Sequence, residues 1–303
     1  MRSKALLGRE EGSAIVLVGL SMVLLLAMAG LVIDLGTVFA TKVQLQKTAN
    51  AAVLSGAQEL TNTQSAVTDV VNQVLTDHGE LSSLVNTSIE MKKKVSVDLN
   101  RDVPLAFSKL FGLASFPVGA HAAAEIQPMV GATGVVPLGI PSTTDLTYYT
   151  DYTLKVDETG VDTGNFGVLA LGGPGAQTYE DNLKYGYQSK IETDDIIDTQ
   201  TGNVAGKTRD AIQDRINRCP YPVGETYHRD CPRTILIPVY DPWEISVNQV
   251  KKVKITGFAY FYIMDPMNWQ DKTIHGMFIE YAGTGVVNPV AKNYGAYGIR
   301  LTE

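Results

Sequence analysis

The sequence SAIVLVGLSMVLLLAMAGLVIDLGTVFA, residues 13–40, decides the fold of this protein. It contains no charged side chain between Ser13 and Ile33. At a rise of about 1.5 Å per residue, a helix of this length crosses a hydrocarbon layer of about 30 Å. A helix is expected because every backbone amide must find its partner inside a segment that lipid surrounds. The alternative is a cleaved signal peptide, but its apolar core has only about 7–15 residues, so the length favours a retained membrane helix.

The charges that flank this run predict its orientation. The leader MRSKALLGREEG at residues 1–12 carries Arg2, Lys4 and Arg9, and positive residues beside a first span favour a cytoplasmic N-terminus. The chain after about Asp34 is then expected outside the cell membrane. Asp34 ends the apolar run, where a carboxylate can reach the lipid headgroups. The alternative is a functional carboxylate inside the membrane.

The predicted helix continues beyond the membrane. The segment TVFATKVQLQKTANAAVLSGAQEL at 37–60 contains no proline and keeps apolar or small residues at helical spacing. Ala49, Ala52 and Gly56 form a stripe of small residues, which lets another helix approach closely. Two interpretations stay open. The stripe packs on the soluble domain of its own chain, or it packs on helices of other subunits and makes a homo-oligomer.

Several motifs of this region occur together in one known family. A short charged leader ends at Gly12, an apolar span follows, and a D-x-G pattern near its outer end precedes LQ…A-(D/N)-A-A-x-L-(A/S)-G-A. This combination resembles the TadE/TadG-like pilus-assembly proteins of Tad-type, type IV-related Flp pili. The matching residues are Asp34, Gly36, Leu45, Gln46, Ala49, Asn50, Ala51, Ala52, Leu54, Gly56 and Ala57. The segment VSVDLNRDVPLAFSKLFGLASFPVGAHAAAEI at 95–126 also fits the family pattern, so the resemblance covers residues 13–128.

The resemblance implies a structural or assembly component of a pilus or a related surface filament. Its implied partners are the membrane and other filament subunits. Pilin-like proteins are cut after a glycine that ends a charged leader, and Gly12 followed by Ser13 has that form. Leu17 departs from the pattern, because pilins usually carry a glutamate there. A retained leader and a permanently membrane-bound protein are the alternative.

The remaining sequence predicts an α+β fold in which a β-rich region follows a helical one. Residues 61–128 form a small α+β module, with a helix at 61–79, a strand around Val95, Val97 and Leu99, a short helix at 105–113 and a strand at 116–128. Residues 129–303 form a β-rich, sandwich-like or barrel-like extracytoplasmic domain, which one helix at 206–217 interrupts. Its expected strands are 149–157, 166–171, 184–192, 233–240, 252–264, 275–283 and 294–303.

Composition limits the possible ligands. The 303 residues have a formal net charge of −7, so the chain has no basic footprint for nucleic acid. The four histidines have no metal-binding spacing, and the acidic run at 192–203 lacks the glycine and closing glutamate of a calcium loop. The glycine-rich LGGPGAQTY at 171–179 lacks the lysine of a phosphate-binding loop. We therefore expect no catalytic site, no metal and no cofactor.

The only two cysteines are Cys219 and Cys231, in the segment RCPYPVGETYHRDCP. The predicted topology puts them in a non-cytosolic space, where two cysteines that close a short loop favour a disulfide. The alternative is a metal site with His228, which would supply only three ligands.

These observations together predict a single-pass membrane protein with a cytoplasmic N-terminus, a charged leader at 1–12, a helix at 13–60, a module at 61–128 and a β-rich domain at 129–303. The expected function is structural, in a Tad-type pilus or filament that extends outside the cell. The first alternative is a membrane-anchored adhesion or ligand-binding ectodomain, with Tyr148, Tyr149 and Tyr152 as aromatic contacts. The second is an anchored hydrolase.

Overall fold

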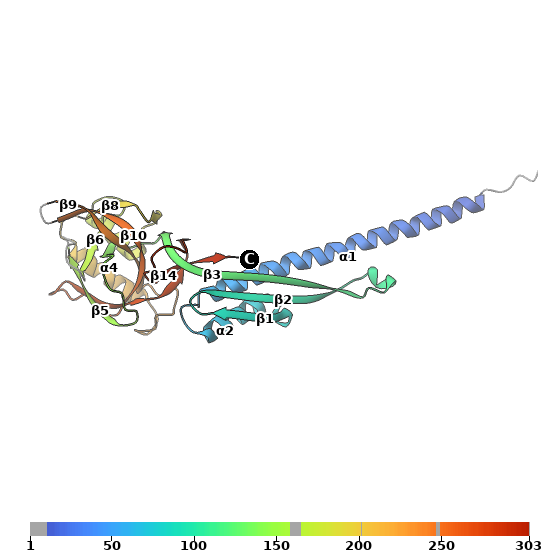
Figure 1. Cartoon of the computed structure of the whole chain (residues 1–303), viewed down its shortest axis with the longest axis horizontal. Coiled ribbons are helices and arrows are strands. Elements are labelled where there is room, and N and C mark those ends of the chain that lie inside the picture. The colour runs from blue at the N-terminus through green and yellow to red at the C-terminus, as the bar shows by residue number, and fades with distance from the viewer. Residues whose placement is uncertain (1–10, 158–164, 201, 247–248, 303) are drawn as a thin grey trace, which may run out of the picture.

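A computed structural model describes residues 11–157, 165–200, 202–246 and 249–302. The molecule is elongated, and one long helix, α1 (Glu11–Ala57), projects from it (Figure 1). The predicted helix at 13–60 is therefore confirmed. Residues 14–26 of α1 are exposed, the β-hairpin tip meets the helix at Gly30 and Asp34, and its second half lies against a sheet.

The second half of α1 packs on a small α+β module. It lies with α2 (Gln64–Asp77) over the strands β1 (Leu84–Glu90), β2 (Lys94–Pro104) and β3 (Ser115–Ala132). The alternation of apolar and polar residues predicts β2. The structure agrees, because the residues on its inward face, among them Val95 and Val97, are fully buried. The residues of β3 that face α1 include alanines at 120, 122 and 124. Because their side chains are small, the helix backbone approaches the sheet closely.

The strand β1 was not predicted from the sequence. It lies at the edge of the sheet and pairs only with β2 in the strand order of the described residues. Its burial alternates weakly, with no fully buried side chain. The apolar alternation that predicts a half-buried strand is therefore missing from its sequence.

The last strand of the chain belongs to this first sheet. The order is β1-β2-β3-β14-β12, in which β14 (Ala296–Leu301) pairs with β3 and β12 (Tyr281–Gly283) pairs with β14. The short strands β7 (Ile191–Glu192) and β13 (Val286–Val287) also pair with β3. Because β3 runs through the expected division at 128/129, the two regions share one continuous strand.

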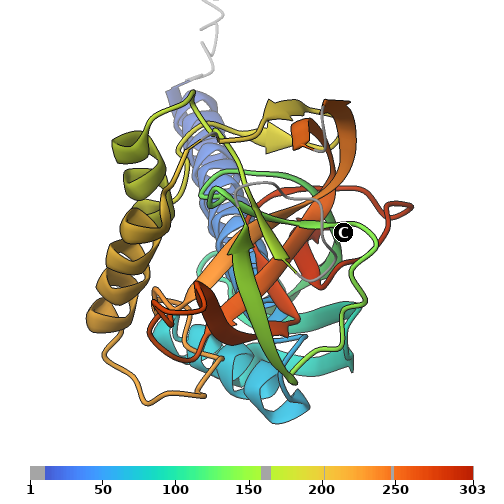
Figure 2. The same cartoon turned by 90° about the vertical axis from the view of Figure 1, so that its left-hand side faces the viewer.

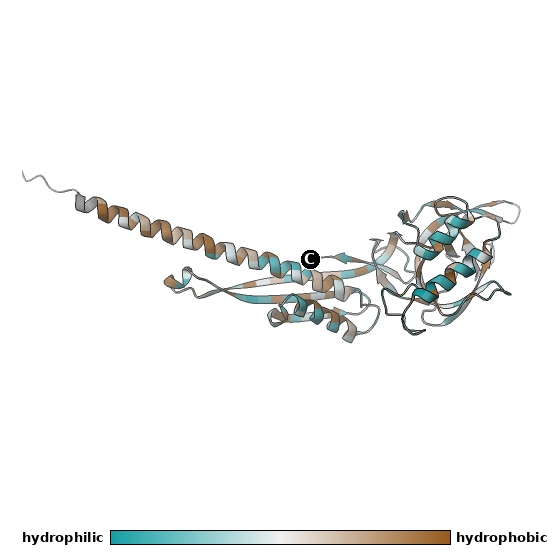
Figure 3. Ribbon diagram, turned by 180° about the vertical axis from the view of Figure 1, so that it is seen from behind, coloured by the Kyte–Doolittle hydropathy of each residue, from teal (hydrophilic) through white to brown (hydrophobic). Residues whose placement is uncertain are grey.

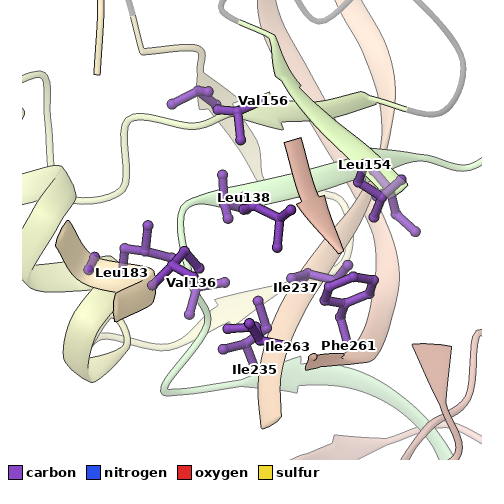
Figure 4. Packing of buried hydrophobic residues seen from close by; sticks show 14 of the residues in the cluster. Val136, Leu138, Leu154, Val156, Leu183, Ile235, Ile237, Phe261 and Ile263 are labelled. Atoms are coloured by element: carbon purple, nitrogen blue, oxygen red, sulfur yellow. The ribbon is translucent and has the colours of Figure 1, made fainter. Parts of the chain in front are cut away.

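The C-terminal region is built on a sheet that closes on itself. The order is β11-β5-β6-β4-β9-β10, and β10 also pairs with β11, so the strands form a barrel. The strand β8 pairs with the first part of β10, and β11 with its last part. The bounds are β4 (Leu138–Pro141), β5 (Asp151–Asp157), β6 (Asn165–Val168), β8 (Ile196–Asp198), β9 (Thr234–Ser246), β10 (Gln249–Ile263) and β11 (Thr273–Ile279). Aliphatic side chains and Phe261 fill its interior (Figure 4). The β-rich expectation is confirmed.

Two helices, not one, cover one side of the barrel (Figure 2). The helix α4 (Ala205–Arg218) is the predicted one, and α3 (Ala176–Tyr185) occupies part of the stretch expected to be a strand. The prediction of a strand at 184–192 was wrong except for the short β7. The helix α3 buries only two large apolar side chains, Tyr179 and Leu183, against the barrel core. This contact with the barrel, rather than a long apolar pattern, stabilises it.

Candidate functional site at the junction of helix and hairpin

The most specific polar contact of the long helix is made by Asp34. This side chain is only 4% exposed, because the loop at the tip of the β2–β3 hairpin covers it. Its carboxylate accepts hydrogen bonds from the backbone N–H groups of Ala106 at 2.9 Å, Phe107 at 3.1 Å and Ser108 at 2.6 Å. One carboxylate thus binds three successive amides that lie more than seventy residues further along the chain.

The local structure of the loop explains why these amides are available. The tip contains a short 3₁₀ helix, η2 (Ser108–Phe111), whose first amide, that of Ser108, has no partner within the helix; Ala106 and Phe107 immediately precede it. Gly112 ends η2 in the left-handed conformation, with φ 92°. The amide of Leu113 returns to the Ser108 carbonyl at 3.2 Å. Asp34 therefore binds the first amide of η2 together with the two backbone amides that precede it.

A glycine on α1 makes room for the loop. A Cβ atom at Gly30 would lie 2.6 Å from Cγ of Phe107, and real Cβ atoms essentially never approach another atom so closely. Gly30 is one helical turn before Asp34, so both face the hairpin tip. The glycine admits the ring of Phe107, and the carboxylate binds the backbone beside it.

An open apolar groove lies between α1 and the tip, beside Phe107 and towards the N-terminal half of the helix. Its volume is about 740 Å³, and Val23, Leu26, Leu110 and Phe111 are among the residues that line it. Leu110 and Phe111 are 81% and 75% exposed. The hairpin tip therefore presents large apolar side chains next to the free half of α1. The hydropathy colours show the apolar character of that half (Figure 3).

Two further hydrogen bonds hold the hairpin along α1. The ammonium of Lys42 donates a hydrogen bond to the carbonyl of Gly119 at 2.5 Å. The side-chain amide of Gln46 donates one to the carbonyl of His121 at 2.6 Å. Both acceptors are on β3. Together with Asp34, these contacts hold the hairpin along the helix over more than two turns.

The sequence singled out Asp34 but not its partners. The expectation of a carboxylate that reaches the headgroups missed the buried contact with residues 106–108. Gly30 and Phe107 were also missed. The local signal for the loop is Pro104 and Gly112, which bound it in the sequence; no local signal points to Gly30.

The stripe of small residues is buried within its own chain. Ala49 and Ala52 have no exposed surface and belong to the core between α1 and the sheet. A Cβ atom at Gly56 would lie 2.7 Å from a methyl group of Val71 on α2. These three residues therefore pack on the module of their own chain, which is the first of the two interpretations given above. Any contact of α1 between subunits must use other residues.

The two cysteines form the expected pair. Cys219 and Cys231 are joined by a disulfide with an S–S distance of 2.04 Å. His228, the third ligand of the alternative metal site, stacks on Tyr221 and contacts the carboxylate of Glu225 at 2.7 Å. Among the described residues, no group of three or more His, Cys, Asp or Glu side chains is arranged to hold a metal ion.

Other sequence-based candidates lie apart from the junction. Residues 1–10 of the leader are outside the described residues, and Gly12 and Ser13 are in the first turn of α1. Tyr148 and Tyr152 pack against the barrel core, and the hydroxyl of Tyr149 donates to the Glu280 carbonyl. Tyr148 and Tyr152 are therefore partly buried, whereas Tyr149 is 47% exposed.

The comparisons with known proteins agree with the N-terminal motifs. Residues 12–59 match the family described as putative Flp pilus-assembly TadE/G-like, which confirms the resemblance for this segment. Residues 60–128, to which the resemblance was extended, lie outside the match. No curated protein and no solved structure matches the chain. The matched segment coincides with α1, the one described helix that is long and apolar enough to cross a membrane.

Proposed function

We propose that this chain, through its TadE/G-like segment at 12–59, is a membrane-anchored structural or assembly component of a Tad-type pilus. The observation that carries the proposal is the division of α1 into two halves. The second half is built into the chain's own module, and the first half exposes apolar side chains from Ile15 to Ile33. A bare apolar helix on a folded body is what a membrane anchor or a filament core requires.

The proposed orientation has the leader in the cytoplasm and the module and barrel outside. Arg2, Lys4 and Arg9 support it, because positive residues are retained on the cytoplasmic side of a first span. The disulfide between Cys219 and Cys231 also supports it, because disulfides persist in oxidising compartments.

Two fates of the bare half of α1 are compatible with this role. If the chain is cut between Gly12 and Ser13, the anchoring charges are lost, and helices of neighbouring subunits can replace the lipid in a filament. If the leader is retained, the helix stays in the bilayer and the chain acts as an assembly factor. The proposed role is structural in both cases, and the proposed partners are other pilus subunits.

Fractionation of the native host tests the proposal. Cells are sheared, and the chain is followed in filament, membrane and soluble fractions, with filament-deficient cells as the control. Recovery with filaments indicates a subunit, and recovery with membranes indicates an assembly factor. Recovery as a free soluble protein would contradict both. N-terminal sequencing of the recovered chain separates cleavage, which gives a start at Ser13, from retention, which gives a start at Met1 or Arg2.

Protease treatment of intact, wall-stripped cells tests the orientation. The segments after residue 60 should be digested, whereas the leader should be spared. Full protection of the C-terminal region would overturn the outward orientation.

A further inference from the structure

We propose that the tip of the β2–β3 hairpin, residues 103–117, enters the hydrocarbon layer beside α1 as a second membrane-embedded element. The proposal rests on the membrane anchoring of α1 proposed above. It assigns the exposed apolar side chains of the tip to lipid acyl chains rather than to water or to another protein.

The first observation is the distribution of charge along the hairpin. Residues 103–117, VPLAFSKLFGLASFP, contain one charged residue, Lys109. Arg101 and Asp102 come immediately before this segment and are exposed. The hairpin thus changes from charged to apolar at one level, as a protein does where it crosses from water into lipid.

The second observation is that α1 changes character at the same level. Lys42 is the first charged residue after Asp34, and its ammonium bonds the carbonyl of Gly119. In the β2–β3 register Gly119 pairs with Asn100, and the next two pairs contain Arg101 and Asp102. The charged residues of helix and hairpin therefore end side by side. A planar boundary of water and lipid requires this coincidence, whereas the surface of a protein partner does not.

The third observation is the apolar surface below that level. Phe39 of α1 is 70% exposed although it lies beyond Asp34. On the hairpin the large exposed apolar residues are Phe107, Leu110, Phe111, Leu113 and Phe116. Soluble proteins rarely present so many large apolar side chains together. Transfer of these side chains into hydrocarbon removes their apolar surface from water, which is favourable.

The fourth observation is that the tip has few free backbone donors. The amides of Ala106, Phe107 and Ser108 bond Asp34. The amides of Leu105, Leu110, Gly112 and Leu113 bond carbonyls within the loop. In lipid an unpaired amide costs several kcal/mol, so a non-helical segment tolerates that environment only when the protein satisfies its backbone. The Asp34 contact meets this condition.

The same contact explains a carboxylate at membrane depth. A rise of about 1.5 Å per residue puts Asp34 about 12 Å below Lys42 along the helix. A carboxylate there is costly unless it is paired. Asp34 accepts hydrogen bonds from three amides of the tip. These bonds give the carboxylate its hydrogen-bond donors and give the three amides their acceptor. Lys109, the one charge of the tip, is exposed, and the cost of bringing its ammonium into the layer has to be offset by the five large apolar side chains around it.

A depth measurement on the full chain tests the proposal. Leu110→Cys is labelled with a nitrobenzoxadiazole maleimide without reductant, so that the native disulfide is kept. The labelled chain is reconstituted into phosphatidylcholine–phosphatidylglycerol vesicles with or without bromine on the acyl chains. Val32→Cys, 67% exposed and about 15 Å below Lys42 along the helix, is the lipid-exposed control, and Asn100→Cys, at the level of Lys42, is the surface control. Phe111→Cys repeats the measurement at a second exposed position of the tip.

We expect the bromolipids to quench the Leu110 and Phe111 labels as strongly as the Val32 label, and the Asn100 label much less. Strong quenching at Val32 with weak quenching at both tip positions would overturn the insertion of the tip and leave the anchor in place. Weak quenching at Val32 would contradict the anchor, and with it this inference. A further outcome is that the tip labels report an apolar environment only in isolated filaments and not in vesicles. That result would show that a neighbouring subunit covers the tip, and it would overturn the assignment to lipid.

Discussion

The guanidinium of Arg229 donates a hydrogen bond to Oε1 of Glu59 at 3.0 Å, across 170 residues of sequence. The same guanidinium donates to the Ala282 carbonyl at 2.7 Å and to the Gln58 carbonyl, and it lies 4.8 Å from the ring centroid of Tyr281. Glu59 follows the end of α1, Arg229 is in the disulfide loop, and Ala282 is in β12. A single side chain therefore joins the end of the long helix to the C-terminal region.

A double-mutant cycle on this pair measures its contribution. We expect Arg229→Ala and Glu59→Ala to show a coupling free energy of about 0.5–3 kcal/mol, because the two residues share one hydrogen-bond network. Denaturant unfolding in detergent provides the free energies. The matched control is Arg209 with Asp210, an exposed pair whose cycle should give at most about 1 kcal/mol. A coupling for Arg229 and Glu59 no larger than that of the control would contradict the role of the contact.

Replacement of Asp34 should release the hairpin tip. Asp34→Ala leaves three amides without their acceptor, at a cost of about 1–3 kcal/mol for each one that stays buried. Asp34→Asn keeps one side-chain oxygen and should have an intermediate effect. Hydrogen exchange of residues 105–114 reports the loss, and Asp69→Ala on the exposed face of α2 is the control. Unchanged exchange in Asp34→Ala would show that the tip is held in another way.

A side chain at Gly30 should displace Phe107. Gly30→Val places a Cβ atom 2.6 Å from Cγ of the ring, whereas a Cβ atom at Gly36 would meet nothing within 4 Å. Gly36→Val therefore has the same effect on helix propensity without the collision. We expect the amides of residues 105–114 to exchange their hydrogens faster in Gly30→Val than in Gly36→Val or the unaltered chain. Equal rates in all three proteins would rule out the need for a glycine at this position.

The disulfide should stabilise the C-terminal region by about 3 kcal/mol on the chain-entropy account of a short loop. Arg229 lies inside this loop, so Cys219→Ser with Cys231→Ser should also weaken the contact with Glu59. Thermal unfolding of the oxidised and doubly substituted chains measures the difference, and a reductant should affect only the former. Non-reducing mass mapping of protein from the cell surface checks the pairing, and two free thiols there would disprove it.

The buried carboxylate of Glu180 should make the region around α3 sensitive to acid. Hydrogen bonds from Lys184 at 2.6 Å and Lys207 at 2.5 Å lower the pKa of Glu180 below its ordinary value of 4.5. A lowered folded pKa contributes stability that is fully present above about 4.5 and is lost as the pH falls through the folded pKa.

Melting temperatures measured between pH 6 and pH 3 test this dependence. This range extends over about three pH units around the ordinary pKa of glutamate. Glu180→Gln should lower stability at the upper end of this range and flatten the decline towards the lower end. Asp181→Asn, at the exposed neighbouring position, should leave the decline unchanged. Parallel curves for Glu180→Gln and the unaltered chain would contradict the role of the ion pairs.

The sequence by itself determined the elements whose signal is local. The uncharged run at 13–33 predicts α1, because a run of that length without charge or proline is typical of a helix that lipid surrounds. Alternation in 94–104 predicts β2, because one face of that strand is buried. The β-branched and aromatic residues of 252–264 predict β10. The cysteine pair also follows from composition, since a chain with two cysteines has only one possible intramolecular disulfide.

The tertiary structure decided which distant segments meet. No periodicity shows that Asp34 binds the amides of residues 106–108, because any carboxylate near the end of a span has the same local sequence. The small stripe at Ala49 and Ala52 fits a neighbouring subunit or the chain's own sheet equally well, and only the position of β3 selects the sheet. The return of β14 to β3 and the closure of β10 on β11 are backbone pairings between remote strands. Backbone hydrogen bonds use groups that every residue other than proline carries, so their partners leave no mark in the side-chain pattern.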